Sequence, residues 1–158
     1  WDADLFDQIM DSLMKKIREF HYSIKGYDKA PSAVSKARDN IKNANLEEYI
    51  KIEECNFFDT EKQTEGKLHM VFNPPYDERL DIHMEEFYKN IGDTLKKNYP
   101  ATNAWFITAN LEALKFVGLK PSRKIKLFNA SLEARLVKYE MYEGSKRTKF
   151  QQNLDTLT

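Results

Sequence analysis

The stretch VFNPPYDERLD, residues 71–81, decides how the sequence around it is interpreted. An apolar strand pattern stops at Asn73, and Pro74 and Pro75 follow. Because each proline lacks a backbone donor and fixes φ, the strand cannot continue through them as a central, paired strand. The chain therefore leaves the sheet here, with the Asn73 amide and the Tyr76 ring on a stiff loop. In open α/β sheets, ligands bind at such carboxyl ends of strands.

Helices and strands alternate on both sides of this loop. Apolar side chains recur at three- and four-residue spacing in the predicted helices, and they alternate with polar neighbours or form short runs in the predicted strands. The predicted helices are 5–17, 31–43, 84–97 and 111–117, and the predicted strands are 22–28, 49–55, 67–73, 104–110, 124–129 and 131–142. This order predicts an α/β protein with a parallel sheet.

The last two predicted strands are joined around Asn129 and Ala130, and so short a link allows only an antiparallel hairpin. Within the second of them the apolar phase changes from even to odd positions at Leu136 and Val137. This change predicts either a β-bulge or burial of both faces of the strand.

Composition indicates one domain with a sizeable core, because the chain has 158 residues of which 41% are hydrophobic. The 25 basic and 25 acidic residues balance overall, but residues 115–150 hold 10 Lys and Arg against 3 Glu, a local excess of +7. Lys120, Arg123 and Lys124 in this basic segment are candidates for contact with phosphate groups. The alternative is a solvated hairpin edge on which lysines deter aggregation.

Cysteine and histidine usage favours a cytoplasmic protein without a metal site. Cys55 is the single cysteine, so it has no disulfide partner within the chain, and a buried, inert thiol is the favoured interpretation. His21, His69 and His83 are not at zinc-ligand spacing. No apolar run approaches the ~18 residues of a membrane span.

The residues 73–76 fit a planar exocyclic amine. Its two N–H groups can donate to the Asn73 side-chain oxygen and the Pro74 carbonyl, while the Tyr76 ring stacks on the attached π-system. Hydrogen bonds that favour a tetrahedral nitrogen localise its lone pair and aim it at an electrophile, so that no strong base is needed. The simpler alternative is a rigid turn that ends a strand.

A sulfonium methyl donor is the electrophile that fits the remaining candidate residues. Asp28 follows a predicted strand, where nucleotide-binding sheets place an acidic residue on ribose hydroxyls. Asn56 follows the next strand and could bond an adenine edge, with Phe57 packed on the adenine face. An Asp after a strand is also a common helix cap or turn former.

The segments IKGYDKAPSAVSKARDNIKNANLEEYIKIEECNFFD, VFNPPYDERL and FVGLKPSRKIKLFNASLEARLVKYEMY resemble the catalytic domain of the THUMP-containing ribosomal RNA guanine-N2 methyltransferases. The resemblance covers residues 1–142, and KLFNASLEARL separates this family from the DNA adenine and protein glutamine methyltransferases that share NPPY. It implies a Rossmann-like class I fold, S-adenosyl-L-methionine as cofactor and large-subunit ribosomal RNA as substrate.

Carried over by position, the resemblance implies that Asp28 holds the cofactor's ribose, Asn56 its adenine, and residues 73–76 the target base. The family usually has Asp where Asn56 stands, and the change retains an acceptor. It often has Gly where Asp77 stands, so this chain adds a charge beside the pocket. Arg79 either pairs with a neighbouring carboxylate or touches RNA phosphate.

The chain lacks the glycine-rich loop that binds the methionine end of the cofactor, because its five glycines are widely separated. The resemblance implies that this loop, its strand and the THUMP region lie upstream of residue 1. We therefore expect residues 1–150 to be the carboxyl-terminal portion of the catalytic domain, 151–158 to be a tail, and the chain alone to be inactive and to self-associate through an incomplete sheet. The alternatives are an adenine-N6 or protein-glutamine methyltransferase, or a non-catalytic RNA-binding fragment.

Overall fold

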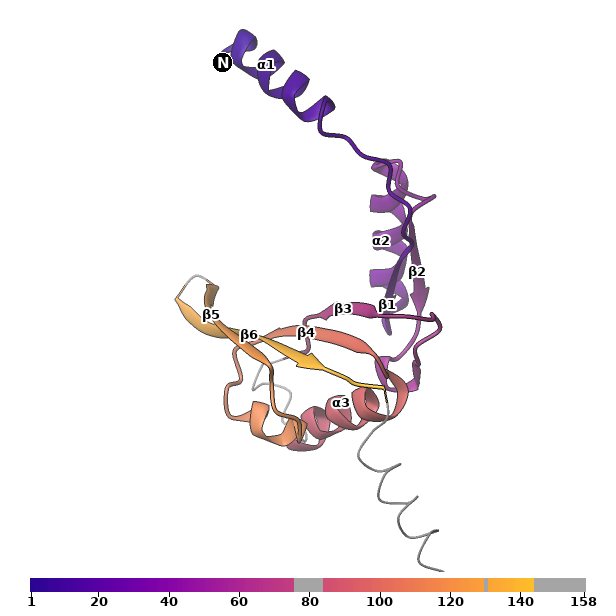
Figure 1. Cartoon of the computed structure of the whole chain (residues 1–158), viewed down its shortest axis with the longest axis vertical. Helices are drawn as coiled ribbons and strands as arrows, with labels where there is room; N and C mark the ends of the chain where they lie inside the picture. Colours follow the sequence, from indigo (N-terminus) through magenta and orange to yellow (C-terminus); the bar gives the residue numbers. More distant parts are fainter. Residues whose placement is uncertain (76–83, 130, 144–158) are drawn as a thin grey trace, which may run out of the picture. The chain divides into compact units, whose positions relative to one another are not determined.

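The computed structural model describes residues 1–75, 84–129 and 131–143. The chain falls into two compact units, Trp1–Phe57 and Phe58–Thr158. In the second unit the structure describes residues 58–75, 84–129 and 131–143. Figure 1 labels the α-helices and strands of both units.

The first unit is a small α/β arrangement (Figure 1). Parallel strands β1 and β2 pair from Ile24↔Ile50 to Asp28↔Glu54, and α2 packs on them. Val34 of α2 is buried, and the Arg38 guanidinium donates to the Ile52 carbonyl at 2.9 and 3.2 Å, which fastens α2 to β2. Its elements are α1 (Ala3–Met14), β1 (Ile24–Asp28), α2 (Pro31–Asn43) and β2 (Ile50–Glu54).

The second unit contains a four-stranded mixed sheet in the order β3-β4-β6-β5. β3 runs parallel to β4, β4 runs antiparallel to β6, and β5 and β6 form an antiparallel hairpin. Its elements are β3 (Leu68–Phe72), α3 (Met84–Asn98), β4 (Thr102–Thr108), η2 (Ala113–Val117), β5 (Arg123–Asn129) and β6 (Leu132–Glu140), and the short helix η1 (Phe57–Asp59) spans the junction of the two units.

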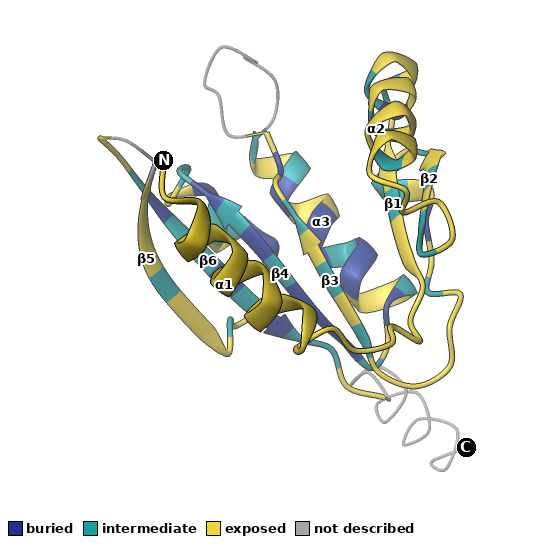
Figure 2. Ribbon diagram, turned by 90° about the horizontal axis from the view of Figure 1, so that it is seen from above, coloured by how far each residue is buried: buried dark blue, intermediate teal, exposed yellow. Residues whose placement is uncertain are grey.

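The core of the second unit lies between α3 and one face of this sheet. Tyr88 of α3 and Tyr139 of β6 are both fully buried around Phe106 of β4. The Phe106 ring lies 5.6 Å from the stacked Tyr139 ring and 4.9 Å from the Phe72 ring of β3. Figure 2 shows the buried residues concentrated along α3, β4 and β6. Because Phe72 belongs to this cluster, the end of β3 is held in the core.

The predicted order of strands and helices and the closing antiparallel hairpin are confirmed. Of the two explanations predicted for the change of apolar phase, the β-bulge is excluded, because the β5–β6 register is unbroken from Asn129↔Leu132 to Arg123↔Lys138. The change of apolar phase reflects burial on both faces instead: Val137 is buried on the face toward α3, and Leu136 is half-buried on the other.

The predicted helix 111–117 is a short 3-10 helix, η2, and Gly118 ends it as predicted with φ 64°. Gly118 adopts this left-handed conformation at little steric cost. Within the described parts of the chain, no helix has the length and hydropathy that a membrane span requires.

Candidate functional site

Asn73, Pro74 and Pro75 lie directly beyond the carboxyl end of β3, as predicted. Pro74 is buried, whereas Asn73 and Pro75 are exposed. Among the described residues the Asn73 side chain has no hydrogen-bond partner. The buried proline thus anchors the loop to the core while the neighbouring amide faces solvent. Tyr76 and Arg79 lie outside the described residues.

The neighbouring end of β4 is fixed by a chain of hydrogen bonds. The Tyr88 hydroxyl lies 2.5 Å from the Thr108 hydroxyl, which also accepts the Asn110 N–H at 3.0 Å. The Asn110 side-chain oxygen in turn accepts the Ala113 N–H at 3.0 Å, at the start of η2. Burial raises the pKa of Tyr88, against a smaller lowering by its bond to Thr108, so the phenol stays protonated at neutral pH.

Thr108 and Asn110 are not among the site residues predicted from the sequence. An Asn just before a predicted helix is a capping signal, and it could have been recognised as one here. The predicted strand 104–110 includes Asn110, whereas β4 ends at Thr108.

Asp28, Asn56 and Phe57 gather at the carboxyl edge of the β1–β2 pair. Asp28 is the last residue of β1 and lies opposite Glu54, and its carbonyl accepts the Cys55 N–H at 3.0 Å. Asn56 is exposed and Phe57 is half-buried. The strand register therefore brings these three residues to one sheet edge.

The Asp28 carboxylate is exposed and accepts the Ala30 N–H at 2.8 Å. This bond is the one that the turn-former interpretation predicts. A carboxylate has about four acceptor positions, so one backbone bond leaves others open to ribose hydroxyls. The two interpretations are compatible in this geometry.

Lys120, Arg123 and Lys124 are all exposed, but they do not form one surface. Arg123 and Lys124 are consecutive in β5, and successive side chains of a strand point to opposite faces. Arg123 pairs with Lys138 of β6, which pairs with Trp105 in the middle of β4, so Arg123 lies away from the carboxyl edge where Asn73 stands.

Two cationic side chains that are not among the predicted RNA contacts lie closer to that edge. Arg135 of β6 is paired with Thr108, the last residue of β4, and Lys126 of β5 is paired with Arg135. Counting the hairpin register outward from the turn around Asn129 would have placed Lys126 opposite Arg135.

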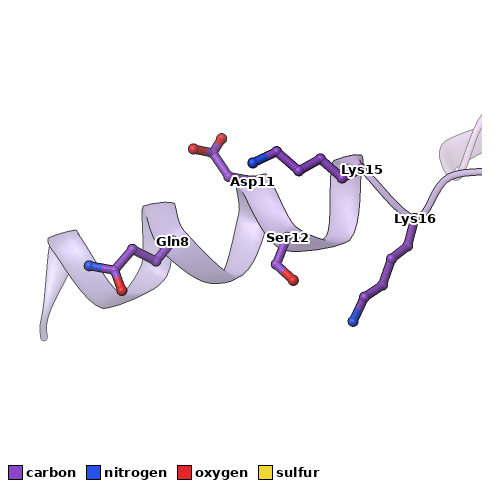
Figure 3. Close-up of a pocket in the computed structure, with 5 residues that line it drawn as sticks. All are labelled: Gln8, Asp11, Ser12, Lys15 and Lys16. Atoms are coloured by element: carbon purple, nitrogen blue, oxygen red, sulfur yellow. The ribbon is translucent and has the colours of Figure 1, made fainter.

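A hollow along α1 is lined by Gln8, Asp11, Ser12, Lys15 and Lys16 (Figure 3). All five side chains are exposed and come from the helix or the two residues after it, so nothing encloses a ligand there. Among the described residues, no three His, Cys, Asp or Glu side chains are placed to hold a metal ion. The Cys55 thiol is half-buried.

Comparison with known proteins decides the family. The family model described as the RMKL-like methyltransferase domain matches residues 5–138. The chain belongs to this family. It is 28% identical over 142 residues to the ribosomal RNA large subunit methyltransferase K/L of Hahella chejuensis, covering 87% of this chain and 20% of that protein. The same-named protein of Methylococcus capsulatus is 34% identical over 120 residues, covering 75% of this chain and 16% of the relative.

A solved structure supports the fold assignment. The crystal structure of SMU.472 complexed with SAH matches with a TM-score of 0.79 at 22% identity, over 92% of this chain and 39% of that one. This likeness confirms the predicted Rossmann-like class I methyltransferase fold. The chain thus spans about a fifth of the length of the Hahella relative and two fifths of SMU.472.

Proposed function

We propose that this chain is the part of an enzyme that places a guanine of large-subunit ribosomal RNA for methylation of its exocyclic N2 amine by S-adenosyl-L-methionine. The observation that carries the proposal is the exposed Asn73 amide, held beyond the carboxyl end of β3 by the buried Pro74. The family membership and the names of the curated relatives support the reaction and the class of substrate.

In this proposal the target amine donates one N–H to the Asn73 side-chain oxygen and the other to the Pro74 carbonyl, and Tyr76 stacks on the base. These bonds disfavour delocalisation of the nitrogen lone pair into the ring, so that the pair is available to attack. The nitrogen would receive the methyl group that S-adenosyl-L-methionine supplies, S-adenosylhomocysteine would leave, and the amine proton would pass to water. A strong base is not required.

The bound cofactor supplies the electrophilic methyl group. Asp28, Asn56 and Phe57 fit its nucleoside half, because an exposed carboxylate, an exposed amide and an aromatic ring meet at one edge of a parallel strand pair. In the proposal Asp28 accepts the ribose hydroxyl bonds, Asn56 contacts the adenine edge, and Phe57 packs on the adenine face.

The proposal also covers the domain to which the chain belongs, its location in the cell and its partners. Residues 1–150 form the carboxyl-terminal portion of the catalytic domain, the protein acts in the cytoplasm, and Lys120, Lys124 and Arg79 contact RNA, whereas Arg123, which lies on the opposite face of β5 from Lys124, is left out of this contact. Within the part of the chain that the structure describes, β1 and β3 each have an edge that pairs with no strand, and this supports self-association of the isolated polypeptide, because an unpaired strand edge is a template for another strand.

The test is Asn73→Ala in the full-length protein, with Asn43→Ala as the control at an exposed asparagine that ends α2. We expect Asn73→Ala to lower single-turnover methylation by about 10²-fold or more, because the lost hydrogen bond matters most in the transition state. Calorimetry should show nearly unchanged cofactor affinity. Normal turnover in this variant would remove Asn73 from the mechanism.

A further inference from the structure

We propose that one face of the β5–β6 hairpin is a binding surface for the single-stranded RNA that flanks the target base. The inference rests on the proposed function and adds residues to it. The surface, called the hairpin cluster below, consists of Lys124, Lys126, Phe128, Glu133 and Arg135.

The strand register places these five side chains on one face of the hairpin. Lys126 lies opposite Arg135, and Arg135 lies opposite Thr108, so one row of side chains runs from the end of β4 outward to β5. Phe128 lies opposite Glu133 in the next row toward the hairpin turn, and Lys124 precedes Lys126 on the same face. The cluster therefore stands at the carboxyl edge of the sheet, the edge that Asn73 also occupies.

The outer part of this face is not covered by the core. Thr108, at the inner end of the row, is fully buried beside Tyr88 of α3, whereas the Lys126 side chain is 52% exposed. Figure 2 shows the same change, from the buried residues of β4 to the largely exposed strand β5. Phe128 is 64% exposed. An aromatic ring this open on an edge strand contributes little to the fold.

The charges of the cluster suit a polyanion. Glu133 accepts from both Lys126 and Arg135 at 2.6 Å, and these contacts, with the hydrogen bond from Lys126 first, hold its pKa below the usual value. One carboxylate thus positions two cations. With Lys124 the cluster has three cations and one anion, a net charge of +2. Lysine has three N–H donors and arginine five, so donors remain for phosphate oxygens.

The exposed ring gives the surface a second element of nucleic-acid recognition. Proteins that bind single strands combine a cationic groove with aromatic side chains on which bases stack. Here the Lys126 ammonium lies 5.1 Å from the centre of the Phe128 ring. A protein partner fits less well, because the cores of protein–protein interfaces are depleted in lysine and glutamate.

The position of the cluster agrees with the proposed site of methyl transfer. β5 is three strands away from β3 in the sheet, which at the usual strand spacing is about 14 Å from the Asn73 strand. A strand of RNA that delivers a base to Asn73 can therefore continue along the same sheet edge onto the hairpin cluster.

The test measures binding of a fluorescein-labelled 12-nucleotide oligouridylate to the full-length protein by anisotropy over a range of salt concentrations. We expect Phe128→Ala to weaken binding by about 5- to 150-fold, the range for loss of one stacked base, without changing the salt slope. Phe128→Trp should retain the affinity for the oligonucleotide, because tryptophan is also aromatic and can stack on a base. A purely structural role of Phe128 would not predict this result.

For charge, we expect Lys126→Ala to reduce the salt slope by about 0.7, the value for one phosphate contact with a single strand. Lys115→Ala is the matched control. Lys115 also makes an ion pair with a glutamate and also lies 5.1 Å from the centre of a phenylalanine ring, but it belongs to η2 rather than to the hairpin. This control should leave both affinity and slope unchanged.

Unchanged oligonucleotide affinity in Phe128→Ala and Lys126→Ala would overturn the inference. It would also be overturned if Phe128→Ala changed the mass of the protein in sedimentation, and so its self-association, while leaving oligonucleotide affinity unchanged. Single-turnover methylation of large-subunit ribosomal RNA by the same proteins separates the two proposals. Normal methylation with unaffected binding in the variants contradicts the hairpin cluster only. Weakened binding in the variants of a protein that methylates no guanine contradicts the proposed function only.

Discussion

Gly92→Ala should test how closely α3 packs against η2, because these two elements contact each other and Gly92 lies at the contact. A Cβ at Gly92 would lie 1.8 Å from the Val117 carbonyl oxygen, whereas ordinary contacts begin at 3.4 Å, so the two elements must separate by the difference of about 1.6 Å. The carbonyl belongs to backbone and cannot rotate away as a side chain could. Overpacking of this kind costs about 3 kcal/mol. The gain in helix propensity from Gly to Ala returns about 1 kcal/mol, which leaves a net loss of about 2 kcal/mol.

The assay is urea denaturation of the 1–158 polypeptide at fixed protein concentration, followed by the fluorescence of Trp105 in β4. Trp1 is 97% exposed and should change little. Gly66→Ala is the control, because Gly66 has φ 74° and no neighbour within 4 Å, so it tests backbone strain without a clash. We expect it to lose about 1 kcal/mol. If Gly92→Ala were more stable than the parent, helix propensity alone would be acting and the close contact would not exist.

Three further predictions follow from single contacts. Asp28→Ala should weaken S-adenosyl-L-methionine binding by about 1.5–3 kcal/mol in calorimetry and leave RNA affinity alone; equal cofactor affinity would leave only the turn role of Asp28. Tyr139→Phe should stabilise the fold by about 1 kcal/mol, because the buried hydroxyl has no partner among the described residues. Burial raises the pKa of Tyr139 from 10.0 to about 12, so the parent's stability should fall as pH rises through that interval, and the variant's should fall less. Glu133→Gln should lose a contribution to the free energy of unfolding that is present above the ordinary glutamate pKa and disappears as pH falls. The free energies of unfolding of variant and parent, measured by urea denaturation, should therefore converge in acid. A difference that stays constant with pH would contradict the Lys126 and Arg135 contacts.

Local chemistry made several features of the fold predictable from sequence. Two prolines ended β3 at Phe72, Pro31 began α2, and Gly118 closed η2. The link around residues 129 and 130 required a hairpin. Each of these signals acts through the backbone of the residue itself, so it does not depend on what packs around it.

Features that depend on packing were harder to predict. The phase change at Leu136 left a bulge and burial of both faces open, because periodicity reports which side chains are apolar and cannot show whether both faces of a strand are covered. Lys126 and Arg135 were missed for a related reason. The basic segment was interpreted as a linear run, while a strand divides such a run between two faces.

The central claim is that this chain, through Asn73, directs a methyl group to N2 of guanine. The most direct measurement is nucleoside mass spectrometry of large-subunit ribosomal RNA after incubation with S-adenosyl-L-methionine and the full-length protein, parent or Asn73→Ala. The account predicts N2-methylguanosine with the parent and a rate at least about 10²-fold lower with the variant. N6-methyladenosine as the product, or N2-methylguanosine formed equally fast by both proteins, would contradict it.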